Sequence, residues 1–148
     1  MIYAEPLPLH YSWPLYDSDA RFDLGRVTDG ALHVLGAAEK RVGRWSCDLS
    51  DDRLSWGDAT FELFGLPHDL PVTRADALAL YTEESRVVTE RLRAHAIRYR
   101  RGFTLDVHIR PATGGDRWLR LVAATEMADG RARRLHGLKY DVSELYRR

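Results

Sequence analysis

The chain has 148 residues, of which 45% are hydrophobic and 30% are charged. This length and composition suit one globular domain with one sizeable core, and they exclude a disordered chain and a small disulfide-stapled scaffold. The 22 basic residues balance the 22 acidic residues, so no net charge attracts nucleic acid or an anionic membrane surface.

The cysteine count and the hydropathy pattern indicate the cellular compartment in which we expect the protein. Cys47 is the one cysteine of the sequence, so no intramolecular disulfide can form. Residues 1–9 lack the basic and apolar regions of a signal peptide, and no run approaches the ~18 apolar residues that a membrane span needs. We therefore expect a cytoplasmic protein with no membrane span and no nucleic-acid partner.

Residues 1–18 are rich in proline and aromatic residues. Pro6, Pro8 and Pro14 are incompatible with a regular helix. A flexible linker would not carry four aromatic residues, so the segment is predicted to be an extended arm that docks on the domain or on a partner. A free tail is the alternative.

Residues 19–41 have a helical pattern. Small apolar residues recur on alternating steps of four and three, which places them on one helix face. Such a weak helix must bury this face on its own domain or on the same helix of a second copy. We expect a homodimer whose interface includes this face, and its residues are Leu24, Ala31, Leu35 and Ala38.

A strand, a turn and a second strand are predicted over 44–56, followed by three helices of increasing length. Asp58 is the expected N-cap of the first helix and Thr73 that of the second, which spans 74–81. The third helix is predicted over 83–100. Its expected apolar face consists of Val88, Leu92, Ala96 and Tyr99 with His95 on the same side, whereas Arg86, Glu90, Arg93 and Arg100 should face water.

Three further strands are predicted over 103–109, 117–127 and 135–142. Alternating apolar residues define them, and turn residues at 111–116 and 128–130 separate them. A helix should begin at the end of the chain, with Asp141 or Ser143 as its cap and Glu144 placed for a capping box. The expected architecture is α+β: a five-stranded antiparallel sheet with helices on one face, preceded by the N-terminal helix.

Four short motifs follow one another along the chain: residues 42–48 (VGRWSCD), residues 54–56 (LSW) with 61–66 (FELFGL), Arg110 with 115–119 (GDRWL), and residues 135–144 (LHGLKYDVSE). In their sequence and order they resemble a PAS domain of the type common in bacterial sensor kinases and cyclic-dinucleotide enzymes. The resemblance implies an arm and amphipathic helix over 1–41, a PAS domain over 42–145 and the start of an outgoing helix over 146–148.

The sequence also departs from that family. Residues 81–84 (YTEE) replace a turn that often reads HPED, and Cys47 does not match the flavin-adduct cysteine of light-sensing relatives. The resemblance places a small-molecule cavity between the sheet and the helices, and its candidate lining residues are Phe64, Leu92, His95, Tyr99 and Trp118. It also assigns Asp141 and Ser143 to the junction that couples the last strand to an outgoing signalling helix.

Neither a catalytic nor a metal-binding pattern is present in the sequence. The histidines form no H-x-x-x-H pair, and no Ser/His/Asp or Cys/His arrangement can be recognised from the spacing. We therefore expect no enzyme, no metal site and no cofactor. In haem-binding PAS relatives, a histidine of the corresponding helix binds the iron, so a haem held by His95 is the alternative, and a hydrogen-bonded histidine at the edge of the apolar face is the simpler interpretation.

These observations predict a non-catalytic sensory or protein-interaction module of bacterial signal transduction. It would act through dimerisation or through docking on a signalling partner such as a kinase, with a small molecule optionally bound in its core. The alternative is a haem- or metabolite-binding sensor domain of a histidine kinase or diguanylate cyclase.

Overall fold

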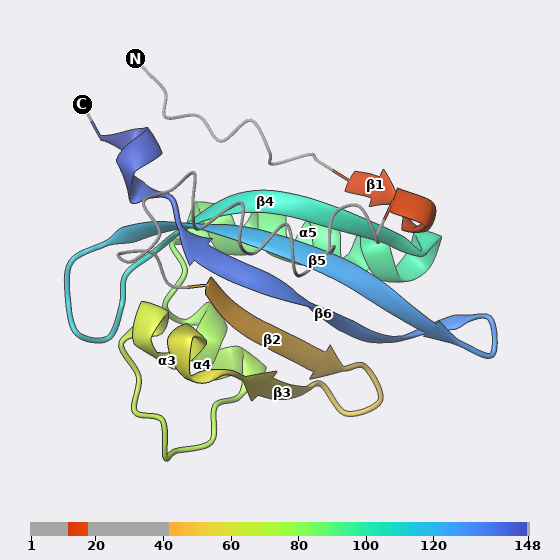
Figure 1. Ribbon diagram of the computed structural model, residues 1–148, viewed down its shortest axis with the longest axis horizontal. Helices are drawn as coiled ribbons and strands as arrows, with labels where there is room; N and C mark the ends of the chain where they lie inside the picture. Colours follow the sequence, from red (N-terminus) through yellow and green to blue (C-terminus); the bar gives the residue numbers. More distant parts are fainter. Residues whose placement is uncertain (1–11, 18–41, 148) are drawn as a thin grey trace.

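The computed structural model describes residues 12–17 and 42–147 of the chain. From residue 42 onwards, two strands, three helices and three strands follow one another in the order that the sequence predicts (Figure 1). They are β1 (Ser12–Pro14), η2 (Leu15–Asp17), β2 (Val42–Asp48), β3 (Arg53–Trp56), α3 (Asp58–Phe64), α4 (Arg74–Leu78), α5 (Glu83–Tyr99), β4 (Arg101–Ile109), β5 (Arg117–Ala128), β6 (Arg131–Asp141) and η4 (Ser143–Tyr146).

The strands form one antiparallel sheet in the order β1-β4-β5-β6-β2-β3. The five predicted strands are all present, and the α+β class is confirmed. The short strand β1 is an additional sixth strand that pairs with β4 at one edge of the sheet. The predicted helix over 19–41, with its dimer residues, lies outside the described residues.

The hairpin between β5 and β6 follows directly from its turn residues. Asp129 and Gly130 both have positive φ angles, 53° and 74°. This is the backbone geometry of the two-residue turn that matches the twist of the flanking strands, and Asp-Gly is a preferred sequence for it. The resulting register brings Lys139 of β6 opposite Leu121 of β5 and Gly43 of β2.

The main core lies between the helices and the inner face of the sheet. Alternate residues of the central strands point into it, as the period of two in a strand requires. The buried residues of this core are Leu63, Phe64, Tyr81, Leu92, Ala96, Phe103, Leu105, Val107, Ile109, Leu119, Leu121 and Ala123.

The buried face of α5 differs from the predicted one. It includes Ser85 and Thr89 together with Leu92 and Ala96, whereas Tyr99 is exposed. The two polar side chains can be buried because both are hydrogen-bonded: Ser85 Oγ accepts from the His108 backbone N–H, and Thr89 Oγ1 donates to the Ser85 carbonyl. Apolar periodicity does not detect these buried polar residues, so the predicted buried face of α5 is rotated about the helix axis relative to the observed one.

The helix caps agree with the predictions only in part. Thr73 forms the expected cap of α4, and Asp76 completes a capping box with it. The cap of α3 is Gly57, and the predicted cap Asp58 is instead the first helical residue. The helix α5 ends at Tyr99, one residue before the predicted end, and its C-cap Arg100 has the left-handed conformation.

Gly102 provides room for the Trp13 side chain on the outer face of the sheet. A Cβ atom at position 102 would lie 2.2 Å from the Trp13 ring. The indole Nε1 donates to Thr104 Oγ1 at 3.2 Å, and the ring packs with Val122 and Ala124. The aromatic arm thus docks on the domain at Trp13, while Tyr16 is exposed.

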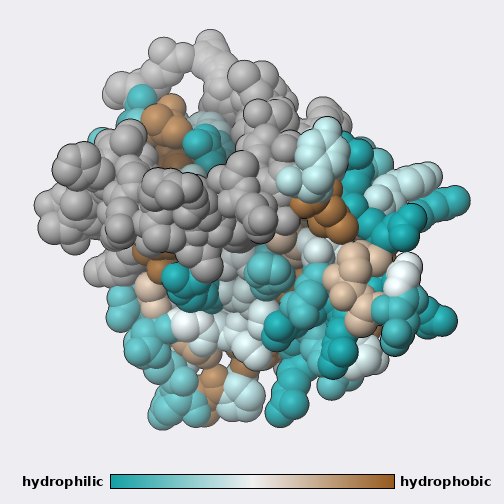
Figure 2. Space-filling model, turned by 45° about the vertical axis from the view of Figure 1, so that its right-hand side comes forward, coloured by the Kyte–Doolittle hydropathy of each residue, from teal (hydrophilic) through white to brown (hydrophobic). Residues whose placement is uncertain are grey.

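The described surface is mainly hydrophilic on the face shown in Figure 2, where the hydrophobic side chains form small separate patches. Among the described helices, none is long and apolar enough to cross a membrane.

Candidate functional site

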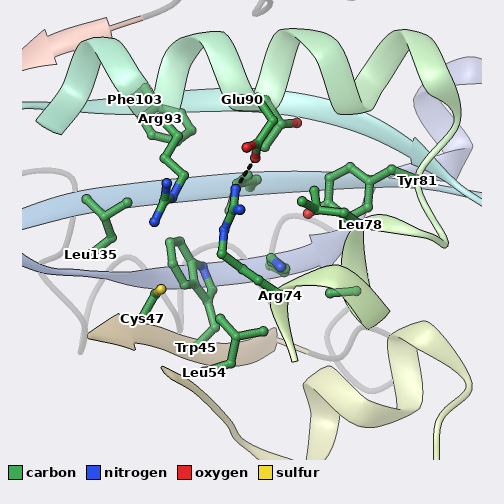
Figure 3. A pocket seen from close by; sticks show the side chains of 14 residues that line it. Trp45, Cys47, Leu54, Arg74, Leu78, Tyr81, Glu90, Arg93, Phe103 and Leu135 are labelled. Carbon is green, nitrogen blue, oxygen red and sulfur yellow. Dashed lines mark hydrogen bonds and ion pairs between the residues drawn. The ribbon is translucent and has the colours of Figure 1, made fainter. Parts of the chain in front are cut away.

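A cavity of about 60 Å³ lies between the inner face of the sheet and the helices α4 and α5 (Figure 3). Its volume has room for roughly four water molecules. Most of its wall is apolar, but it includes four charged side chains. The lining residues are Trp45, Cys47, Leu54, Arg74, Ala77, Leu78, Tyr81, Thr89, Glu90, Arg93, Phe103, Leu121, Leu135 and Lys139.

Lys139 is the most unusual residue of this wall. Only 6% of it is exposed, although a lysine is almost never fully buried without an acidic partner. Its Nζ makes no hydrogen bond or ion pair with the residues that the structure describes. Instead it faces four aromatic rings at 4.9–5.9 Å from their centroids, and these are Phe64, Trp45, Trp56 and Tyr81.

Burial determines the protonation state of this amine. Removal of the ammonium group from water lowers the pKa of Lys139 to about 7, and the nearby Cys47 opposes the change only weakly. The surrounding rings favour the protonated form through cation–π contacts. With its pKa lowered to about 7, Lys139 loses its proton near neutral pH far more readily than an ordinary lysine does.

Two tryptophan side chains beside Lys139 also have unused donors. Trp45 and Trp56 both have a buried indole Nε1 without a hydrogen-bond partner in the described structure. Buried N–H groups are normally paired. Of these two indoles, that of Trp45 lines the cavity together with Lys139, whereas Trp56 is not part of the cavity wall.

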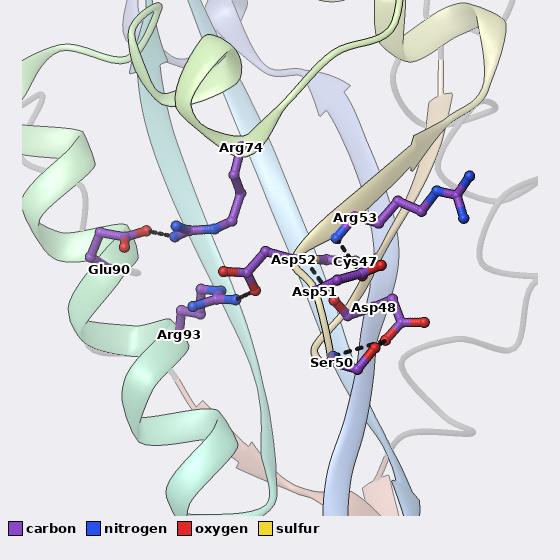
Figure 4. Close-up of polar contacts among 9 residues, drawn as sticks. All are labelled: Cys47, Asp48, Ser50, Asp51, Asp52, Arg53, Arg74, Glu90 and Arg93. Carbon is purple, nitrogen blue, oxygen red and sulfur yellow. Dashed lines mark hydrogen bonds and ion pairs between the residues drawn. The ribbon is translucent and has the colours of Figure 1, made fainter.

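Two ion pairs lie at the rim of the cavity, between the helices and the β2–β3 turn (Figure 4). Arg74 of α4 pairs with Glu90 of α5, and Arg93 of α5 pairs with Asp52 of the turn at 2.8 Å. All four side chains are partly exposed, so the cavity meets solvent here. Glu90 and Arg93, which were predicted simply to face water, therefore belong to the wall of the site.

None of the five predicted pocket residues contributes to the wall of this cavity. Phe64 and Leu92 are in the core, and Phe64 also faces Lys139. His95 and Tyr99 are exposed on α5, with ring centroids 4.8 Å apart, so their predicted inward orientation is wrong. Trp118 is on the outer face of the sheet, where its ring stacks on His108 and Tyr146.

The residues present do not fit a haem. A cavity for roughly four waters is far too small for a tetrapyrrole, and His95 lies outside it on the exposed side of α5. The imidazole would need to face a flat apolar cavity in order to bind iron there. We therefore derive no role for haem in this chain.

The predicted junction residues Asp141 and Ser143 do lie together at the end of β6. Asp141 Oδ1 accepts from the Ser143 backbone N–H at 2.8 Å, and Ser143 Oγ accepts from the Trp118 backbone N–H at 2.9 Å. The element that follows is the short 3-10 helix η4, whose N-cap is Val142. The predicted capping box is absent, because Glu144 pairs with Arg147 instead.

A second polar cluster attaches η4 to the outer face of the sheet. The Asp106 carboxylate is buried on β4 and accepts two hydrogen bonds from Arg120 of β5, at 2.7 and 2.9 Å. Tyr146 of η4 donates its hydroxyl to the same carboxylate. The hydrogen bond to Asp106 raises the pKa of Arg120 above its usual value, so this guanidinium group remains charged throughout the physiological range.

Sequence reasoning did not select Lys139, although the alternation of its strand contained the signal. Leu135, Gly137 and Lys139 are spaced by two, so a strand that buries Leu135 must point Lys139 towards the same core. Trp45 and Tyr81 both face the same amine. Their convergence on one amine could not be predicted, because they belong to segments that only the folded chain brings together.

Replacement of Lys139 by methionine is expected to stabilise the protein by on the order of 1–2 kcal/mol at neutral pH, because it removes a buried and unpaired amine. Between pH 7 and the ordinary lysine pKa, the unfolded chain binds more protons at this position than the folded one. The stability contribution of Lys139 therefore rises with pH across this window.

Chemical denaturation of both proteins at several pH values measures the effect. The stabilisation by Lys139→Met should be largest near pH 6 and should decrease towards pH 10. A Lys40→Arg variant controls for the loss of a lysine elsewhere in the chain. A stabilisation that is independent of pH would contradict the assigned pKa.

No protein-family model matches the sequence, and no curated protein is found to be similar to it. Solved structures, in contrast, are similar in fold. The N-terminal domain of a diguanylate cyclase with a PAS/PAC sensor from Marinobacter aquaeolei has 16% sequence identity and a TM-score of 0.66, and the match covers 72% of this chain and 100% of that one.

Two further solved structures are also similar in fold. A sensory box histidine kinase/response regulator from Burkholderia thailandensis has 18% identity and a TM-score of 0.64, over 85% of this chain and 87% of that one. The LOV domain of a blue-light activated histidine kinase from Erythrobacter litoralis has 23% identity and a TM-score of 0.55, over 68% of this chain and 95% of that one.

The open antiparallel sheet, with helices and a cavity on one face, defines an α+β architecture. In particular, the chain has the PAS fold, as its motifs predict.

Proposed function

We propose that this chain is a non-catalytic sensory module of bacterial signal transduction that acts in the cytoplasm through dimerisation or docking on a signalling partner. The observation that carries the proposal is the PAS fold with a cavity between its sheet and its helices. The similar structures named above come from a diguanylate cyclase and from histidine kinases. Such a module senses through its core and transmits the signal through its surfaces.

The dimer is assigned to the apolar face of the segment 19–41. The residues of this face are spaced so that a helix would present them together, and an exposed apolar stripe needs a partner. We expect the full-length chain to have the mass of a dimer in light-scattering measurements, and the double variant Leu24→Glu, Leu35→Glu to have the mass of a monomer.

A matched control is available on the same segment. His33 lies on the opposite side of the expected helix, so His33→Glu adds a charge without altering the apolar face. This variant should remain a dimer. A wild-type protein that is monomeric at high concentration, or a double variant that remains dimeric, would contradict the assigned interface.

The metabolite-binding alternative is favoured by a separate observation. The wall of the cavity includes the buried amine of Lys139 and the indole of Trp45, whose N–H group has no acceptor among the described residues, and these two groups could bind a small molecule that has an oxygen acceptor. On this interpretation, occupancy of the cavity would be the signal.

A further inference from the structure

We propose that Lys139 is the attachment point of a small carbonyl compound, an aldehyde or a ketone, which enters the cavity and forms an imine with Nζ. This inference deepens the proposed sensory function, because it names the chemistry of the ligand. It does not depend on whether the chain dimerises.

The first argument is the geometry around Nζ. The amine lies in the wall of a mainly apolar cavity that is open to solvent at one rim, and no acidic side chain is bound to it. A lysine with a purely structural role in a core is normally paired with a carboxylate. Here the cavity that Lys139 lines and the missing acceptor leave room for an exogenous group.

The second argument is the reactivity of the amine. Imine formation requires the neutral form of lysine, and burial in an apolar pocket is one of the ways in which proteins provide it. The charged and titratable groups in the same wall are Cys47 on β2, Arg74 on α4, Tyr81, and Glu90 and Arg93 on α5. Glu90 is already paired with Arg74. Among these groups, only Cys47 raises the pKa of Lys139, and the effect of burial is larger.

The third argument is the set of unused donors. The indole of Trp45 lines the cavity, and its Nε1 has no partner in the described structure. A carbonyl oxygen, or the hydroxyl of the intermediate that follows, is an acceptor that such a donor can bind. The four rings around Nζ would also stabilise a protonated imine through cation–π contacts.

The chemistry balances without an oxidant or a reductant. The lone pair of Nζ attacks the carbonyl carbon, the carbon–oxygen π bond breaks, and a proton moves from nitrogen to oxygen to give a carbinolamine. The hydroxyl group then leaves with the second amine proton as one molecule of water, and the carbon–nitrogen double bond forms. Hydrolysis reverses the reaction, so the attachment can report the concentration of the carbonyl compound.

The size and the entrance of the cavity limit the ligand. Room for roughly four waters corresponds to a compound of only a few non-hydrogen atoms. Entry is expected at the rim, where the ion pairs Arg74–Glu90 and Arg93–Asp52 are partly exposed. Ion pairs of this kind contribute little to stability, so they can open at low cost.

The test is reductive trapping on the full-length protein with glyoxylate and cyanoborohydride at pH 7, followed by peptide mass mapping. Each trapped imine adds one carboxymethyl group. The chain contains only two lysines, Lys40 and Lys139, so Lys40 is an internal reference. We expect labelling of Lys139 to exceed that of Lys40 by at least about tenfold, because an ordinary lysine is almost entirely protonated at this pH.

Three controls make the result decisive. In a guanidinium-unfolded sample, the preference for Lys139 should disappear. Lys40→Arg should retain the label at position 139, and Lys139→Met should lose it while retaining the native circular dichroism spectrum. Equal labelling of the two lysines in the folded protein, or thermal stabilisation by glyoxylate without an adduct at Lys139, would overturn the proposal. Neither result bears on the dimer, so the two proposals can fail independently.

Discussion

Replacement of Trp13 by alanine is expected to lower the free energy of unfolding by about 3–5 kcal/mol, the range for truncating a buried tryptophan. The Trp13 ring is almost completely buried on the outer face of the sheet, where it covers Gly102 and contacts Val122 and Ala124. Its loss removes this contact area, together with the hydrogen bond from Nε1 to Thr104. Urea denaturation followed by circular dichroism measures the change.

Tyr16→Ala is the matched control, because this aromatic residue belongs to the same segment but is 86% exposed. Its replacement should alter stability by no more than about 0.5 kcal/mol. If the two alanine variants had equal effects, the docking of β1 on β4 would not contribute to the folded domain. The expected difference means that a fragment beginning at residue 42 would lack part of its own outer face.

Replacement of Asp106 by alanine is expected to cost about 3 kcal/mol. The buried carboxylate accepts two hydrogen bonds from Arg120 and one from Tyr146. Its removal leaves the guanidinium group and the phenol without their acceptor, and breaking a buried pair in this way is strongly destabilising. We place the cost at the lower end of the usual range because Arg120 is partly exposed and can be hydrated.

A second arginine–carboxylate pair on the same face of the sheet is a matched control, because it is exposed. Arg134 of β6 donates two hydrogen bonds to Glu126 of β5, and both side chains are about half exposed. Glu126→Ala should therefore cost no more than about 1 kcal/mol. Thermal denaturation of the two variants compares a buried pair with an exposed one. Similar costs would show that the burial of Asp106 has no energetic consequence.

Asp106→Ala should also release η4 from the sheet. The hydroxyl of Tyr146 loses its acceptor, although the stacking of its ring on Trp118 remains. Faster hydrogen exchange at residues 143–146, measured under conditions in which the rest of the domain is stable, is the expected result. Unchanged exchange there would mean that the stacking alone attaches η4.

The sequence by itself determined the elements that depend on local chemistry. The alternation of apolar residues defined the strands β4, β5 and β6, because a strand with one buried face must repeat every two residues. Thr73 identified the start of α4, and Asp129-Gly130 identified the β5–β6 turn, since both depend on the conformational preferences of a few neighbouring residues. The motif order then led to the PAS fold.

Only the tertiary structure decided which side chains form the cavity. On α5, the burial of Ser85 and Thr89 depends on partners at His108 and on the helix backbone, so apolar periodicity alone placed the face incorrectly. Lys139 is surrounded by rings from β2, β3, α3 and the segment before α5. The pKa of an amine depends on solvent access and on neighbours that are distant in sequence, and these are defined only once the chain has folded.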